Sequence, residues 1–145
     1  MSIQENVTVV REIFNAIECR DARRFHALCH PACELHWPPS LPYGGTTRGL
    51  QQAGPTWSDT WHALQPTEAE RRMEPRVVAA SADEVVVLWR QRGVTPGGDR
   101  CDEEVLGLYH MREGKLARAQ MFYFDTAALV SFLTQAKGHA TVPPP

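Results

Sequence analysis

Three stretches in the second half of the chain decide the fold: DEVVVLWRQRGV (residues 83–94), RCDEEVLGLYHM (100–111) and KLARAQMFYFD (115–125). Each is rich in β-branched, aliphatic and aromatic residues, a composition typical of β-strands. Asp83, TPGGD (95–99) and REGK (112–115) supply turn residues between them. Together with RRMEPRVVAAS (71–81), these stretches predict four strands in an antiparallel meander.

The first half of the chain has helical periodicity. In ENVTVVREIFNAIECRD (5–21), five apolar residues recur on one helical face: Val7, Val10, Ile13, Phe14 and Ile17. A second short helix follows in DARRFHALCH (21–30), with Asp21 as its N-cap, and it ends by His30 because the residue before Pro31 disfavours helix.

The remaining segments predict short elements. CELHW (33–37) predicts a strand that stops at Pro38, and SLPYGGTTRGL (40–50) predicts a turn-rich loop. LQQAGPTWSDTWHAL (50–64) has helical spacing of Trp57, Trp61 and Leu64, and DTAALVSFL (125–133) predicts a closing helix capped by Asp125. Helices followed by an antiparallel meander favour an α+β fold.

Length and composition limit the class of protein. A chain of 145 residues has the size of one domain, which we place at residues 1–136, followed by a disordered tail at 137–145. The net charge of −2 provides no basic field for nucleic acid, and no apolar run approaches the ~18 residues of a membrane span. The start lacks a leader pattern, so we expect a cytoplasmic protein with reduced cysteines.

The strands are apolar on both faces, which predicts that both faces of the sheet are covered by other parts of the structure. VVVLW and VLGLY lack a clean alternation of apolar and polar residues. Helices cover one face, so we expect the other to pack against a second copy of the chain in a homodimer. The predicted interface carries Val86, Leu88, Leu106 and Leu108, with His110 and Arg90 at its edge.

CHPACELHW (29–37) resembles a zinc-ligand cluster in composition only. A zinc site needs about four converging ligands. Pro31 separates the end of a helix from a strand, so Cys29 and Cys33 do not lie on one helical face. On the strand, Cys33 and His36 point to opposite faces, so their side chains do not converge on one ion. We therefore expect no metal, and interpret Cys29 and Cys33 as buried free thiols that pack as small apolar groups.

Several motifs resemble one known family: HPACELHWPPSLPYGG (30–45), TTRGLQQ (46–52), VVVLWRQRG (85–93), LGLYHMREGKL (106–116) and YFD (123–125). The pattern resembles the SnoaL-like polyketide cyclases of the nuclear transport factor 2-like superfamily, over roughly residues 5 to 134. The resemblance implies a strongly curved, antiparallel-rich sheet wrapped around about three helices into a cone-shaped α+β barrel with a deep apolar pocket. It also agrees with a homodimer.

The charged residues of two better-known relatives are absent. Ketosteroid isomerases carry a Tyr and two Asp residues, and the matching positions here are Ile13, Trp37 and approximately Gly107. Limonene epoxide hydrolases carry an Arg-x-Asp and a second Asp, where this chain has Trp89-x-Gln91 and Met121. Steroid isomerisation is therefore disfavoured, and epoxide hydrolysis would need a different set of residues.

The resemblance also implies which side chains face the pocket. Seven residues are predicted to bind substrate: Trp37, Trp57, Trp89, Gln91, Tyr109, Met121 and Tyr123. Trp57 has an alternative interpretation as a core residue, and each tyrosine could equally be a core aromatic. An aromatic cavity with few polar groups suits a flat, apolar ligand.

Four residues are candidates for catalysis: Glu103, Asp125, Tyr43 and His36. A buried Glu103 would have a raised pKa suited to proton transfer, whereas an outward Glu103 would be a solvated charge. Asp125 is either an acid–base group or a helix N-cap. Tyr43 could donate a hydrogen bond to an enolate, and His36 could titrate near neutral pH.

These observations predict a cofactor-independent enzyme that cyclises, isomerises or dehydrates an aromatic or polyketide-like metabolite. A binding module that holds an apolar ligand without transforming it is the alternative from another class, because a fold does not guarantee activity. An epoxide hydrolase-like activity is a third possibility.

Overall fold

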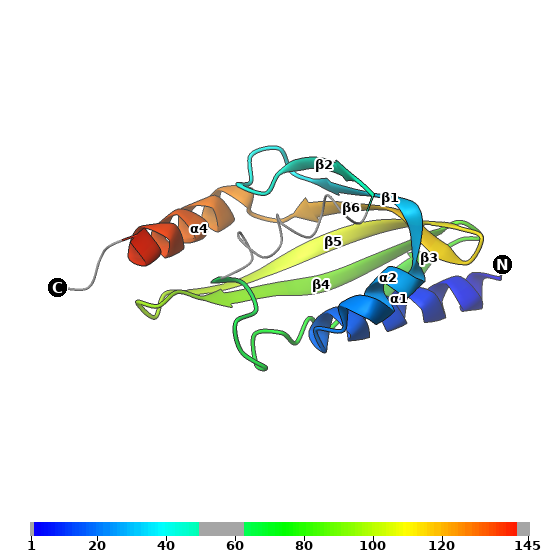
Figure 1. Ribbon diagram of the computed structural model, residues 1–145, viewed down its shortest axis with the longest axis horizontal. Helices are drawn as coiled ribbons and strands as arrows, with labels where there is room; N and C mark the ends of the chain where they lie inside the picture. The colour runs from blue at the N-terminus through cyan, green and yellow to red at the C-terminus, as the bar shows by residue number, and fades with distance from the viewer. Residues whose placement is uncertain (1, 50–62, 142–145) are drawn as a thin grey trace.

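The computed structural model describes residues 2–49 and 63–141, with side chains as far as Ala136. The helices in this part of the chain are α1 (Ile3–Glu18), α2 (Ala22–Leu28) and α4 (Thr126–Thr141). The strands are β1 (Cys29–Trp37), β2 (Gly45–Arg48), β3 (Arg76–Ala80), β4 (Glu84–Val94), β5 (Arg100–Arg112) and β6 (Lys115–Tyr123). The six strands form one curved sheet (Figure 1).

The strand order is β2-β1-β6-β5-β4-β3, and β1 runs parallel to β6 while every other pair is antiparallel. Helices α1 and α2 lie together near one end of the sheet, and α4 follows β6 at the opposite end (Figure 1). This arrangement confirms the predicted α+β fold and the meander from β3 to β6.

Helix α1 begins with a capping box, in which Ser2 Oγ accepts the Glu5 backbone N–H and Glu5 accepts the Ser2 N–H. The predicted apolar stripe is buried, including Val10, Ile13 and Phe14. Asn6 is buried beside this stripe, and its Nδ2 donates to the Ala82 carbonyl at 2.7 Å. The helix is therefore fixed to the turn between β3 and β4.

The hairpin between β5 and β6 turns at Glu113 and Gly114, whose φ angles are both positive (54° and 76°). Two consecutive positive φ angles are typical of a type I′ turn, which joins twisted antiparallel strands directly. The long pairing of β4 with β5 then sets the side-chain alternation. Val85, Val87 and Trp89 lie on the buried face, and Leu88, Leu106 and Leu108 lie on the opposite face.

Two predicted boundaries differ from the structure. The predicted loop 40–50 contains β2, because the β-branched Thr46 and Thr47 pair with β1 in a register that places Thr47 opposite Leu35. At the other end, α4 continues beyond the predicted closing helix at 125–133 and runs to Thr141, across Gly138. The predicted helix at 50–64 lies outside the described residues except for its end, where Leu64 bridges to Gly93 of β4.

Candidate functional site

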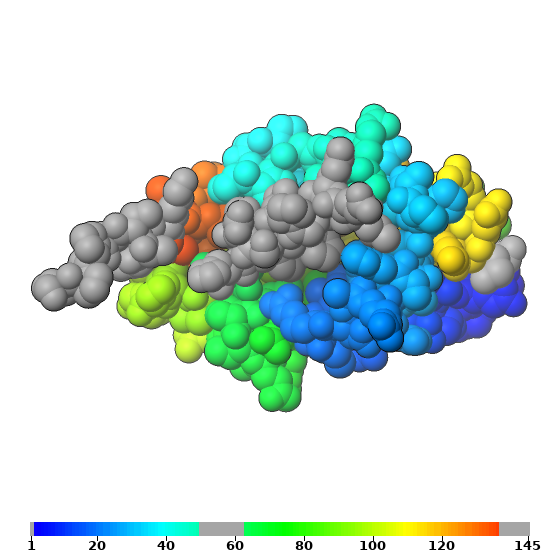
Figure 2. All heavy atoms as spheres, viewed as in Figure 1, coloured from blue at the N-terminus to red at the C-terminus, as the bar shows by residue number. Residues whose placement is uncertain are grey.

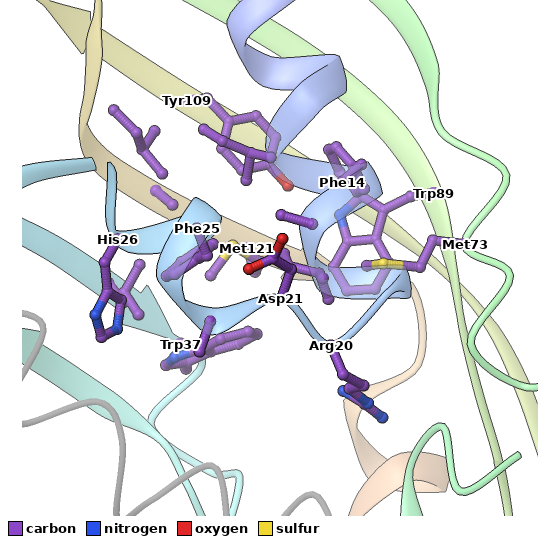
Figure 3. Close-up of a pocket in the computed structure, with 17 residues that line it drawn as sticks. Phe14, Arg20, Asp21, Phe25, His26, Trp37, Met73, Trp89, Tyr109 and Met121 are labelled. Carbon is purple, nitrogen blue, oxygen red and sulfur yellow. The ribbon is translucent and has the colours of Figure 1, made fainter. Parts of the chain in front are cut away.

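A pocket of about 380 Å³ lies between α1, α2 and the buried face of the sheet. Its volume is within the range of small-molecule sites. Its described lining residues are Ile13, Phe14, Ala16, Ile17, Arg20, Asp21, Ala22, Phe25, His26, Leu35, Trp37, Met73, Trp89, Tyr109, Leu116, Ala119 and Met121. Most are apolar or aromatic, and Figure 3 shows the labelled ones around the cavity.

Aromatic contacts hold the pocket walls in place. Phe14 of α1 meets Trp89 of β4 edge to face at 6.0 Å and Tyr109 of β5 at 5.8 Å between ring centroids. Edge-to-face pairs of this kind stabilise a packed arrangement beyond the area they bury. The helix therefore fixes the orientation of both aromatic rings that the sheet contributes.

Tyr109 brings a hydroxyl group into this apolar space because Gly107 leaves room for it. A Cβ atom at residue 107 would lie 2.3 Å from the Tyr109 hydroxyl oxygen, so the phenol lies directly over Gly107. The two residues share one face of β5, since they are two apart in a strand. Burial raises the pKa of the Tyr109 phenol, and the nearby Trp89 indole acts in the opposite direction. The hydroxyl is therefore a neutral hydrogen-bond donor at ordinary pH.

The indole N–H of Trp89 is directed at the Tyr109 hydroxyl, and this interaction is what lowers the pKa of the Tyr109 phenol. Trp89 itself is buried. Figure 3 shows this nitrogen on the side of the ring that faces the Tyr109 hydroxyl. Because a hydroxyl both accepts and donates, the Tyr109 O–H can still donate to a ligand.

Three charged or titratable side chains lie at the rim, at the junction between α1 and α2. Arg20 takes a left-handed φ of 58°, which ends α1 and allows the chain to turn into α2. Asp21 is the N-cap of α2 and accepts the Arg24 backbone N–H at 3.0 Å. His26 is one turn further along α2, beside Phe25. Sequence reasoning assigned none of the three to the site.

A second group of buried polar residues lies beyond the lining of this pocket. The hydroxyls of Tyr43 and Tyr123 are 3.0 Å apart, and the Tyr123 hydroxyl donates to Gln91 Oε1 at 3.3 Å. Burial raises the pKa of both tyrosines. Gln91 is fully buried, and its Nε2 has no hydrogen-bond partner within the described residues.

Glu103 lies on the buried face, the inward one of the two positions left open by the sequence, and is 8% exposed. Its Oε1 accepts the Asp125 backbone N–H at 2.6 Å. Burial raises the pKa of Glu103; the Asp125 N–H lowers it, and the negative charge of Asp125 raises it further. The carboxyl group therefore has the environment of the buried alternative, but it faces the start of α4 and is not part of the described pocket lining.

The predicted site residues thus divide into separate groups. Trp37, Trp89, Tyr109 and Met121 line the pocket. Gln91, Tyr43, Tyr123 and Glu103 lie in the buried polar groups just described. Trp57 lies outside the described residues.

Asp125 and His36 have structural partners. Asp125 Oδ1 accepts the Ala128 N–H at 3.0 Å, so Asp125 caps α4. His36 lies on the other face of β1 from the pocket residue Leu35, and its Nε2 is 3.1 Å from Glu34 Oε1. These contacts favour the cap interpretation of Asp125 and a surface position for His36.

Cys29 and Cys33 are both buried, and their thiols lie close together at the irregular part of β1. This contact and burial raise the pKa of Cys29. Within residues 2–49 and 63–141, no group of three or more His, Cys, Asp or Glu side chains is placed to hold a metal ion. The same part of the chain contains no helix with the length and apolar character of a membrane span.

A family model for the SnoaL-like domain matches residues 10–119, so the chain belongs to this family. A comparison with curated protein sequences gave no significant match.

Solved structures have the same fold. TerC, co-crystallised with polyporic acid, has a TM-score of 0.77 at 20% identity, over 90% of this chain and 98% of TerC. An NTF2-like protein of unknown function from Burkholderia pseudomallei K96243 has a TM-score of 0.77 at 22% identity, covering 92% and 99%. A protein described as a SnoaL-like polyketide cyclase from Jannaschia sp. CCS1 has a TM-score of 0.69 at 18% identity, covering 99% and 97%. These similarities establish the nuclear transport factor 2-like fold.

Proposed function

We propose that the protein is a cofactor-independent enzyme that transfers protons within an apolar pocket, and so cyclises, isomerises or dehydrates an aromatic or polyketide-like metabolite. The observation that carries this proposal is the buried Tyr109 hydroxyl, supported by the Trp89 indole N–H, inside an otherwise apolar cavity. A flat ligand fits between aromatic walls, and a carbonyl or enolate oxygen would accept from the Tyr109 hydroxyl.

Such donors favour a reaction in which negative charge develops on oxygen. Hydrogen bonds in a site without competing water stabilise an enolate more than they stabilise the neutral carbonyl. Tyr109 stays protonated because burial raises its pKa, so it can donate throughout the reaction. Membership of the SnoaL-like family and the small molecule in the TerC crystals support binding of an organic ligand in this fold.

Proton transfer to and from the substrate needs a base and an acid, and two groups of residues in the chain are candidates for these roles. Asp21 and His26 line the pocket at its rim. Glu103, with its raised pKa, lies deeper behind the lining. A base must be within hydrogen-bond reach of the substrate, directly or through one water, so geometry favours the rim pair and pKa favours Glu103.

Turnover of aromatic polyketide intermediates by purified variants tests the proposal. We expect Tyr109→Phe to lower kcat by about a hundredfold, the lower end of the range for removing an oxyanion donor. Glu103→Gln, Asp125→Asn and Asp21→Asn compare the carboxylates, and Arg23→Gln on the exposed side of α2 is the matched control. Equal turnover in Glu103→Gln, Asp125→Asn and wild type would remove both of these predicted carboxylates from the mechanism.

A binding module remains the second candidate, because no carboxylate lies among the described lining residues deep in the pocket. The same preparation separates the two functions. Binding of the intermediates without turnover, unchanged by Asp21→Asn or Glu103→Gln, would favour the binding module. An epoxide substrate in the panel tests the third possibility, hydrolysis with a non-standard set of residues.

A further inference from the structure

Arg20 at the rim of the pocket lies beside Arg71, and neither arginine has a carboxylate partner within the described residues. Arg20 lines the pocket, and its Nη2 donates to the Gln65 carbonyl at 2.7 Å. Arg71 donates to the same carbonyl from Nε, at 3.4 Å. Other arginines of the chain, such as Arg24, Arg90 and Arg92, form ion pairs with carboxylates.

The position of the shared carbonyl is fixed by the fold. Gln65 is fully buried, its backbone N–H donates to the Arg92 carbonyl at 2.8 Å, and its φ is 54°. The segment 63–75, green in Figure 2, lies beside α1 and α2, in blue, and Met73 N donates to Glu18 Oε1 at 3.0 Å. A left-handed residue that is anchored on both sides directs this carbonyl toward the two guanidinium groups.

The two guanidinium groups are also close enough to repel each other. Partial burial and the positive charge of Arg71 lower the pKa of Arg20. Asp21, next in sequence, does not neutralise the pair, because its carboxylate caps α2, and Figure 3 shows the Arg20 and Asp21 side chains pointing in different directions. Two positive charges held together without a counter-charge among the described residues favour a bound anion.

Each guanidinium group has five N–H donors, and one from each is used by Gln65. The remaining donors can bind a carboxylate or an ionised enol in the paired geometry that arginine prefers. We infer that the ligand is an amphiphilic aromatic acid, whose flat apolar part lies against Trp37 and Trp89 and whose anionic group pairs with Arg20 and Arg71 at the rim. This inference rests on the proposed pocket function and adds the charge of the substrate.

A matched pair of probes tests it: 2-naphthoate and its neutral analogue 2-naphthamide, with dissociation constants measured by isothermal titration calorimetry. We expect wild type to bind the anion about five- to tenfold more tightly, the lower end for a charge-assisted contact because the rim is partly exposed. Arg20→Gln and Arg71→Gln should reduce this ratio toward one, whereas Arg20→Lys should keep part of it. Arg23→Gln, which removes an equal charge from the other side of α2, should leave the ratio unchanged.

The ratio of the two affinities separates charge recognition from general damage to the pocket, because a distorted pocket weakens both probes. Raising the salt concentration from about 0.05 M to about 0.5 M should lower the affinity for the anion and not for the amide. Equal affinity of wild type for the two probes, or a preference that survives both Gln variants, would overturn the anion site and leave the pocket intact. Failure of both probes to bind would contradict the pocket function and this inference with it.

Discussion

Glu103 shows how burial changes the chemistry of a single residue. Its carboxyl group is nearly enclosed, and burial raises its pKa above the ordinary value of 4.5. The folded state therefore favours the protonated form. The stability that Glu103 contributes is fully present below its unfolded pKa and is lost as the pH rises through its higher folded pKa.

We predict that Glu103→Gln weakens this pH dependence. Between about pH 4 and about pH 8, the thermal midpoint of wild type should fall relative to that of Glu103→Gln, because Gln does not ionise and its oxygen can still accept the Asp125 N–H. Glu104→Gln on the exposed face of β5 is the control. A constant difference in midpoint across the pH range would show that Glu103 is ionised as readily in the folded state as in the unfolded state.

Gly107 makes a second residue-scale prediction, since Tyr109 occupies the space above it. Gly107→Ala places a methyl group 2.3 Å from the Tyr109 oxygen, so the ring must move. Overpacking of this kind costs about 1–3 kcal/mol of unfolding free energy. We expect chemical denaturation to show this loss in the wild-type background and a smaller loss in a Tyr109→Ala background. The same cost in both backgrounds would mean that the clash involves other atoms.

The elements were predictable where one physical signal dominated. The strands from 76 to 123 were predictable because they combine a composition typical of β-strands with strong turn residues. The residues on the buried face of β4, β5 and β6 are also the ones predicted to face the pocket, because successive side chains of a strand point to opposite faces. Strand β2 was missed because its four residues lie between two glycine-containing turns and gain their structure from pairing with β1.

The rim residues could not be found from periodicity. Arg20 follows the end of one helix and Asp21 caps the next. When only the sequence is known, these local roles already account for both residues. Their place at the pocket depends on packing against a segment some 45 residues away, at Gln65. A run of polar residues between two amphipathic helices was the only signal in the sequence.

Helix α4 gives a prediction at the scale of an element, because Asp125 is its cap. Asp125→Ala should lower the unfolding free energy by about 1 kcal/mol, whereas Asp125→Asn should lower it little, since Asn also accepts the Ala128 N–H. Denaturant titration of the three proteins measures both effects. If Asp125→Asn is stable but loses turnover, the carboxylate is needed for catalysis as well as for the cap.

At the scale of the whole molecule, the outer face of the sheet is the largest unexplained feature. This face carries apolar side chains that the described helices do not cover, including Leu106 at 39% and Phe122 at 49% exposure. Val86, Leu88 and Leu108 lie on the same face, half-buried by their neighbours. Arg90 at its edge is paired with Asp102 at 2.7 Å, so the charges there are already balanced.

We propose that two copies of the chain pack through this face as a symmetric homodimer, because a self-complementary patch gives the commonest oligomer symmetry. An ordinary interface would bury about 800 Å² per partner. Leu106→Asp and Leu108→Asp would each place an unpaired charge in the contact, which costs several kcal/mol and should cause dissociation or aggregation. Light scattering at micromolar concentration measures this, with Arg23→Gln on the exposed side of α2 as a control that removes a charge away from this face. A wild type that is monomeric and soluble would contradict the dimer, and the exposed leucines and Phe122 would then need another partner.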